Sequence, residues 1–117
     1  MNLMNPNEIL DIELELTTYC NADCPLCYRN YKTFKEHYPK TISRDLETIK
    51  KDINKFPNLN FIKLVGSISE PTLYRNFFEL VKFIKSKHIR IEICTNGDTH
   101  NENNGIWWFE LGELLGE

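Results

Sequence analysis

The sequence predicts an α/β fold made of three βα units with a parallel sheet. Three short segments, residues 9–16, 61–65 and 89–94, alternate apolar and polar residues with the period of a half-buried strand. Each is followed, directly or after a loop, by a stretch in which apolar residues recur at helical spacing, so strands and helices alternate along the chain. Crossover connections of this kind place neighbouring strands parallel and are almost always right-handed.

The first unit follows an irregular lead-in, which we expect over residues 1–8 of a single domain spanning residues 1–117. Its strand carries leucine and isoleucine at alternate positions, with carboxylates between them. Residues 30–42 show no clear period and are expected to form a long, partly ordered loop. Ser43 is predicted to cap the first helix, and Pro57 to end it. The buried stripe of this helix comprises Leu46, Ile49, Ile53 and Phe56.

The second and third units have more compact connections. Asn76 is predicted to cap the second helix, with Glu79 three residues later completing a capping box. The buried stripe of that helix comprises Phe77, Leu80, Val81 and Ile84. A last helix is expected over residues 106–115, where Trp107 and Trp108 lie among leucines at helical spacing.

The composition argues against nucleic-acid and membrane functions. The 117 residues carry a formal net charge of −3, which gives no electrostatic reason to bind nucleic acid. No apolar run approaches the roughly 20 residues of a membrane span, and the first residues lack the basic and apolar regions of a signal peptide. Three of the four cysteines lie in one loop, which indicates a reduced, cytoplasmic compartment rather than secreted disulfides.

The cysteine loop directly follows the first strand. Cys20, Cys24 and Cys27 are spaced Cys-x3-Cys-x2-Cys, close enough to converge on one inorganic centre. A four-iron cluster normally takes four thiolates, so three from one loop would leave one iron open to a non-protein ligand.

These cysteines have two other interpretations. Cys24 and Cys27 alone could form a redox dithiol or half of a zinc site. A zinc site normally needs a second pair of ligands, and the sequence offers only isolated candidates: Cys94, His37, His88 and His100. A dithiol leaves Cys20 unexplained, so the spacing favours a cluster.

The cysteine spacing, its place after the first strand, and two later turns resemble the radical S-adenosylmethionine (radical SAM) superfamily. The resemblance implies that Cys20, Cys24 and Cys27 hold a [4Fe–4S] cluster whose fourth iron binds S-adenosylmethionine. It further implies reductive cleavage of S-adenosylmethionine to methionine and a 5′-deoxyadenosyl radical, which abstracts hydrogen from a substrate. The family usually has an aromatic residue before the third cysteine, near the adenine. Leu26 stands there and is expected to make an apolar contact instead.

The two later turns also lie at the carboxyl ends of predicted strands, where α/β proteins carry their functional loops. The turn at residues 66–71 resembles the family's glycine-glycine-glutamate segment. It implies that Gly66, Ser67, Ser69 and Glu70 hold the amino group of S-adenosylmethionine.

The third-strand ending resembles the family segment that borders the ribose, which implies ribose contacts from Thr95 and Asn96. Without the resemblance, Glu70 would be a solvated residue in an ordinary turn. Asp98 and His100 are expected on a solvated loop.

The strands also predict a polar concave face. Buried parallel strands usually read as continuous apolar runs, whereas these alternate apolar residues with charges. The charged set, expected on the side away from the helices, comprises Glu13, Glu15, Lys63, Arg90 and Glu92. Because Lys63 belongs to the middle strand, we expect it to pair with carboxylates on neighbouring strands. Cys94 shares this parity and is expected to point inward at the rim, without a ligand role.

The resemblance covers residues 9–115 and corresponds to the first half of the family's partial TIM barrel. We therefore expect a truncated core domain, or a half that a second chain completes. An electron donor is an implied partner, and the substrate cannot be read from the sequence. The alternatives are a non-catalytic zinc or iron–sulfur binding module and an inactive fragment.

Overall fold

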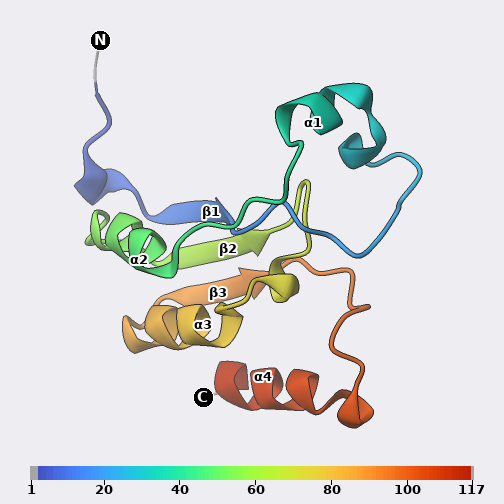
Figure 1. The fold of residues 1–117 in the computed structure, drawn as a ribbon. Coiled ribbons are helices and arrows are strands. Elements are labelled where there is room, and N and C mark those ends of the chain that lie inside the picture. The colour runs from blue at the N-terminus through green and yellow to red at the C-terminus, as the bar shows by residue number, and fades with distance from the viewer. Residues whose placement is uncertain (1–2, 117) are drawn as a thin grey trace.

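Three parallel strands form one sheet in the computed structural model, which describes residues 3–116 (Figure 1). The strands, in the order β1-β2-β3, are β1 (Asp11–Glu15), β2 (Phe61–Val65) and β3 (Arg90–Ile93). The register places Glu13 opposite Lys63, and Lys63 opposite Glu92. The predicted α/β fold class with a parallel sheet is confirmed.

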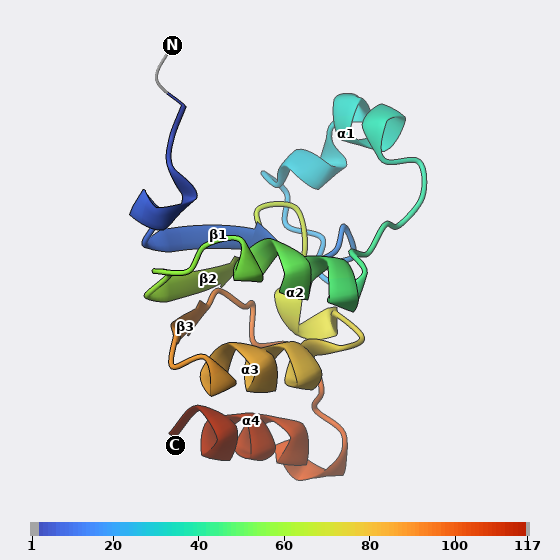
Figure 2. The same cartoon turned by 90° about the vertical axis from the view of Figure 1, so that its left-hand side faces the viewer.

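Helices alternate with the strands. The α-helices are α1 (Lys32–His37), α2 (Leu46–Asn54), α3 (Phe77–Ser86) and α4 (Ile106–Gly116). Short 3-10 turns are η1 (Pro6–Glu8), η2 (Tyr28–Asn30), η3 (Pro71–Leu73) and η4 (Asn103–Gly105). Figure 2 shows α2, α3 and α4 in a row along the sheet, while α1 stands apart beyond the end of β1. Within residues 3–116, none of the helices combines the length and apolarity that a membrane span requires.

The core lies between the apolar face of the sheet and the helices α2 and α3. Ile62 and Leu64 of the middle strand are fully buried there. Leu16, which directly follows β1, is buried with them. The helix residues buried in the same cluster are Ile49 and Ile53 of α2, Phe77, Leu80, Val81 and Ile84 of α3, and Leu111 of α4. The stripe predicted for α3 is therefore confirmed. In α2 the two central positions are buried, whereas Leu46 and the residue beyond the helix, Phe56, are half-buried.

Two predicted helix caps are wrong. Asp45, not Ser43, caps α2, because its carboxylate accepts a hydrogen bond from the Thr48 amide at 3.0 Å. Ser43 lies two residues earlier and instead bridges to Thr17, with 2.8 Å between their hydroxyl oxygens. Asn76 does precede α3, but its side chain makes no capping bond. Its backbone, at φ −103° and ψ 34°, lacks the extended conformation that a capping box needs.

The opposite face of the sheet is polar, as predicted. The charged positions of all three strands are exposed or half-exposed, whereas Leu14, Ile62 and Leu64 between them are buried. Lys63 Nζ lies 3.4 Å from Glu92 Oε1, and this hydrogen bond raises the pKa of Lys63 above its ordinary value. Arg90 instead places its guanidinium 5.7 Å from the centroid of the Phe61 ring. The expected pairing of the middle strand is thus confirmed toward β3.

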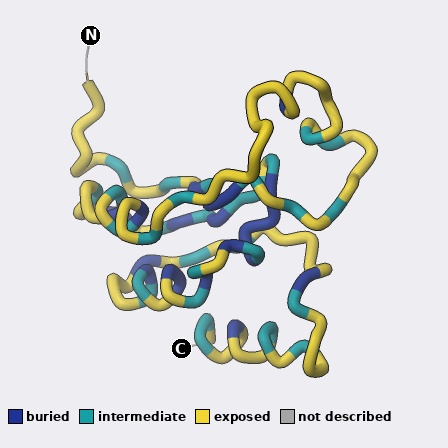
Figure 3. Tube along the Cα trace, in the orientation of Figure 1, coloured by how far each residue is buried: buried dark blue, intermediate teal, exposed yellow. Residues whose placement is uncertain are grey.

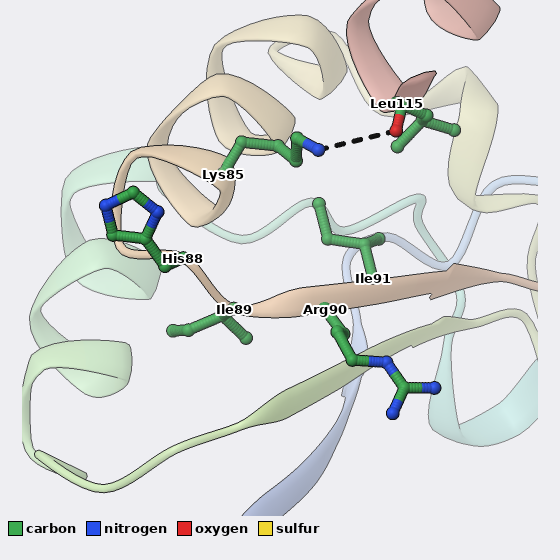
Figure 4. Close-up of a pocket in the computed structure, with 6 residues that line it drawn as sticks. All are labelled: Lys85, His88, Ile89, Arg90, Ile91 and Leu115. Atoms are coloured by element: carbon green, nitrogen blue, oxygen red, sulfur yellow. Dashed lines mark hydrogen bonds between the residues drawn. The ribbon is translucent and has the colours of Figure 1, made fainter. Parts of the chain in front are cut away.

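A hollow of about 430 Å³ lies at the beginning of β3, at the end of the strand opposite the cysteines (Figure 4). Lys85 spans part of it, donating to the Leu115 carbonyl at 3.3 Å and so joining α3 to the end of α4. His88, Ile89, Arg90 and Ile91 line the rest. None of the cysteines lines this hollow, because they lie at the opposite, carboxyl ends of the strands.

Candidate cofactor site at the carboxyl ends of the strands

Three loops that leave the carboxyl ends of β1, β2 and β3 enclose one cavity of about 270 Å³. Its thiols are those of Cys20, Cys24, Cys27 and Cys94. The other predicted site residues that line it are Gly66, Ser67, Ser69, Glu70, Thr95 and Asn96. Ala22, Arg29 and Ile68 complete the wall. The structure therefore brings together every residue of the predicted site except Leu26.

The cysteine loop contains a hydrogen-bonded turn. The Cys27 amide donates to the Cys24 carbonyl at 3.0 Å, and the Asn30 side chain donates to the same carbonyl at 2.7 Å. All three thiols are free, with Cys24 exposed and the other two half-buried. Among the described residues, no three His, Cys, Asp or Glu side chains gather closely enough to hold a single metal ion.

The second loop, residues 66–71, is tightly folded on itself. A Cβ atom at Gly66 would lie 1.9 Å from the Ser69 carbonyl oxygen, so this position requires glycine for a close backbone approach. The Ser69 hydroxyl and the Ile68 amide both donate to the Glu15 carboxylate at 3.1 Å. Glu15, at the end of β1, therefore fixes the second loop rather than pairing along the sheet.

Glu70 is 1% exposed, so the alternative of a solvated side chain in an ordinary turn is wrong. Its carboxylate accepts hydrogen bonds from the Thr72 hydroxyl at 2.6 Å and the Asn96 backbone amide at 2.8 Å. It also accepts from the Thr95 hydroxyl and, at 3.3 Å, from the Thr72 amide. A single buried carboxylate thus joins the second loop to the third.

Two further ties between the loops were not predicted from the sequence. The Arg29 guanidinium donates to the Thr18 carbonyl and, at 2.7 Å, to the Ile68 carbonyl, so it joins the first loop to the second. The Asn21 side chain donates to the Asp98 backbone carbonyl at 2.6 Å and accepts from the Asn96 side-chain amide at 3.0 Å. The sequence shows only that Arg29 and Asn21 lie close to the cysteines. Nothing in it identifies the carbonyl groups that they reach.

Leu26 and Cys94 differ in their position relative to the cavity. Leu26 is 90% exposed and lies outside the cavity lining, so its contact with adenine stays a prediction. Cys94 lies at the rim, as predicted, with its sulfur 3.9 Å from Glu92 Oε1.

His100 is half-buried and packs against the rest of the fold, so the expectation of a solvated loop is wrong for it. Its ring stacks on Trp107 with centroids 3.9 Å apart, and its Nε2 lies 2.7 Å from the Thr72 carbonyl oxygen. His100 therefore anchors the third loop to η3 and does not face the cavity.

The lining groups fit an iron–sulfur cluster with a small polar ligand. Thiolates are the usual protein ligands of such clusters, and three free thiols from one loop line the cavity. The facing wall offers the backbone of residues 66–69 and the polar side chains of Ser67, Thr95 and Asn96. Backbone carbonyls can accept from an ammonium group, while hydroxyl and amide groups suit ribose oxygens.

Comparison with known proteins agrees with this arrangement. A family model described as the radical SAM superfamily matches residues 14–110. The chain is also 34% identical over 88 residues to a Pyrococcus furiosus protein named tungsten-containing aldehyde ferredoxin oxidoreductase cofactor-modifying protein. That match covers 72% of this chain and 23% of the relative, so the chain spans a minor part of the relative's length. No solved structure gives a significant match.

Proposed function

Because this chain belongs to the radical SAM superfamily, we propose that it binds a [4Fe–4S] cluster and S-adenosylmethionine as the cofactor-bearing part of a radical SAM enzyme. The observation that carries the proposal is the shared cavity: Cys20, Cys24 and Cys27 face the 66–70 and 95–96 segments across it. When bound, the cluster supplies the electron that cleaves S-adenosylmethionine to methionine and the 5′-deoxyadenosyl radical.

The three thiols hold the cluster in this proposal. A four-iron cluster binds each thiolate through a different iron atom, so its ligands surround a volume instead of meeting at one point. Three sulfurs along the wall of a cavity of about 270 Å³ suit such a ligand. Cys94 belongs to a different strand end and stays outside this ligand set.

The second and third loops hold S-adenosylmethionine in this proposal. The backbone carbonyls of Gly66, Ser67 and Ser69 take the amino group, and Thr95 and Asn96 take the ribose. The Glu70 carboxylate is enclosed by Thr72, Thr95 and Asn96, which supports a positioning role for it between the two loops. A direct contact between Glu70 and the amino group stays a prediction.

The proposal includes a cytoplasmic location and an electron donor. It also includes further strands that cover the polar face of the sheet, supplied by a longer polypeptide or by a second chain. It names no substrate. The name of the Pyrococcus furiosus relative describes modification of a tungsten enzyme's cofactor, but the similarity reaches 23% of that protein.

Anaerobic reconstitution with iron and sulfide tests the proposal. We expect the chain to take up a four-iron cluster, and the electron paramagnetic resonance spectrum of the reduced cluster to change when S-adenosylmethionine is added. Cys20→Ala, Cys24→Ala and Cys27→Ala should each abolish cluster uptake. Cys94→Ala is the matched control, because it removes a thiol from the same cavity and should leave uptake unchanged.

Three results would contradict the proposal. Tight zinc binding without iron uptake would indicate a non-catalytic zinc module. A cluster whose spectrum ignores S-adenosylmethionine would indicate a structural or electron-transfer site. A chain that binds neither metal would indicate an inactive fragment.

A further inference from the structure

The segment from Leu26 to Lys40 forms a lobe beside the cysteine loop, which we call the basic lobe. It contains η2 and α1, and it stands away from the sheet and from the helices α2, α3 and α4 (Figures 1 and 2). Figure 3 shows that it is exposed along almost its whole length, in contrast to the covered strands. Nothing else in the described chain covers its outer surface.

The basic lobe has its own small aromatic centre. Phe34 is 6% exposed, and its ring centroid lies 5.7 Å from that of Tyr28 and 5.0 Å from that of Tyr38. The Arg29 guanidinium lies 5.0 Å from the centroid of the same ring. These contacts order the lobe without using its outer side chains, so the residues it exposes are held on a defined surface.

The charge of the basic lobe is opposite to that of the rest of the chain. Its cations are Arg29, Lys32, Lys35 and Lys40, and Glu36 is its single carboxylate, so its net charge is +3. The whole chain carries −3, which leaves −6 on the remainder. The three lysines are exposed, whereas Arg29 is half-buried between the loops. A positive surface on an otherwise negative protein orients an approaching acidic partner toward the lobe.

Apolar side chains are exposed among these lysines. Leu26 is 90% exposed, Tyr31 54% and Tyr28 42%. Aromatic residues are enriched at protein interfaces, where tyrosine provides contact area at a low entropic cost. The lobe therefore combines contact surface with a charge that selects the partner.

The basic lobe shares Leu26 and Cys27 with the cysteine loop and is hydrogen-bonded to the rest of that loop. Cys27 immediately precedes η2, and its carbonyl accepts from the Asn30 amide at 3.0 Å. The Asn30 side chain donates to the Cys24 carbonyl at 2.7 Å. A protein seated on the lobe would thus lie next to the thiols of the proposed cluster.

We propose that the basic lobe is the docking surface for an acidic iron–sulfur protein that donates the electron for the proposed reaction. The inference rests on the proposed function, since a bound cluster has to be reduced from outside. In the step, the donor's reduced cluster loses one electron and is oxidised, and the cluster of this chain gains that electron and is reduced; no atom is transferred. Weak electron-transfer complexes of this kind bury less than about 1,200 Å² in total.

Charge favours such a protein over a nucleic acid as the occupant. A long polyanion would also meet the −6 carried by the rest of the chain, whereas a small acidic protein contacts the lobe alone. The exposed tyrosines suit either partner, so RNA binding is one of the outcomes that the test distinguishes.

The test measures how fast the reconstituted protein is reduced by a reduced acidic bacterial ferredoxin in anaerobic stopped-flow mixing. We expect the second-order rate constant to fall as ionic strength rises, because salt screens the attraction. The variant Lys32→Glu/Lys35→Glu/Lys40→Glu should lower it at low salt by about tenfold or more. A variant with the same charge change elsewhere, Lys51→Glu/Arg75→Glu/Lys82→Glu, should stay within about twofold. These three control positions are exposed and lie outside the lobe.

Reduction by photoreduced deazaflavin separates docking from damage to the site, because that small reductant needs no protein interface. It should reduce the wild-type, lobe and control proteins at equal rates. The matched glutamine variant of the three lobe lysines should show an intermediate loss with ferredoxin and unchanged circular dichroism. This second variant covers the case in which the triple glutamate variant unfolds α1.

Equal ferredoxin rates for the wild-type and lobe variants, with deazaflavin reduction intact, would overturn the docking proposal and leave the proposed function standing. The same holds if the lobe variants lose RNA binding while their ferredoxin rate is unchanged. A chain that takes up no iron would overturn both proposals at once.

Discussion

The cysteine loop and the 66–71 loop lie side by side on one cavity, yet they are stabilised in different ways. In residues 20–27 no side chain is buried, and Cys24 is exposed. In the second loop Ser69, Glu70 and Pro71 are all buried, and Glu15 and Thr95 bond to its side chains. The second loop is therefore shaped by protein contacts, whereas the first presents its thiols with few contacts of its own.

This difference shows that the two loops of the site depend on different interactions for their order. The loop proposed to bind an organic molecule is organised in advance, which lowers the entropy lost on binding. The loop proposed to bind metal has ligands whose own bonds to iron would order it, since metal binding and local folding are coupled. Four substitutions test this division, from the largest expected effect on the metal-free protein to the smallest.

Glu70→Ala should be the most damaging change. It leaves the Thr72, Thr95 and Asn96 donors without their buried acceptor, and we expect the free energy of unfolding to fall by about 3 kcal/mol. Urea denaturation followed by circular dichroism measures it. Glu113→Ala, at an exposed position on α4, is the control and should stay within about 0.5 kcal/mol. A loss at Glu70 no larger than at Glu113 would mean that the second loop is not organised by its carboxylate.

Gly66→Ala should cost about 2 kcal/mol in the same assay, because the added methyl group meets the Ser69 backbone and forces the loop apart. Gly112→Ala is the matched control. Nothing lies within 4 Å of a Cβ at Gly112, and alanine favours the helix there, so stability should rise by up to about 1 kcal/mol. Equal effects of the two substitutions would show that the second loop tolerates displacement.

Asn21→Ala sharpens the comparison from the side of the first loop. It removes the bonds to the Asp98 carbonyl and the Asn96 side chain, both exposed, so we expect a loss of about 0.5 kcal/mol. Hydrogen exchange should become faster at the amides of residues 96–98, which this side chain helps to hold. If exchange there is unchanged, Asn21 does not help to position the third loop.

Cys24→Ala should have the smallest effect on the metal-free chain, within about 0.5 kcal/mol, because the thiol is exposed. The same variant should, however, take up no iron on reconstitution. A large loss of stability without metal would contradict the division proposed here, since it would make Cys24 a structural residue of the first loop.

Much of the fold could be predicted because its signals are local. The alternation in residues 61–65 specified both faces of β2, and the spacing of Phe77, Leu80, Val81 and Ile84 specified the buried side of α3. The helix caps were less predictable. Ser43 and Asp45 both have capping side chains, and the choice between them depended on the bridge from Ser43 to Thr17.

The sequence by itself determined the parallel βα order, the three clustered cysteines and the charged face, because hydrophobic period and covalent spacing act over a few residues. Only the tertiary structure decided that Glu70 is enclosed and that Arg29 and Asn21 tie the loops together. Arg29 reaches a carbonyl 39 positions along the chain, and Asn21 reaches one 77 positions away. Partners so distant meet only after the strands have aligned, since no local pattern specifies which donor finds which acceptor.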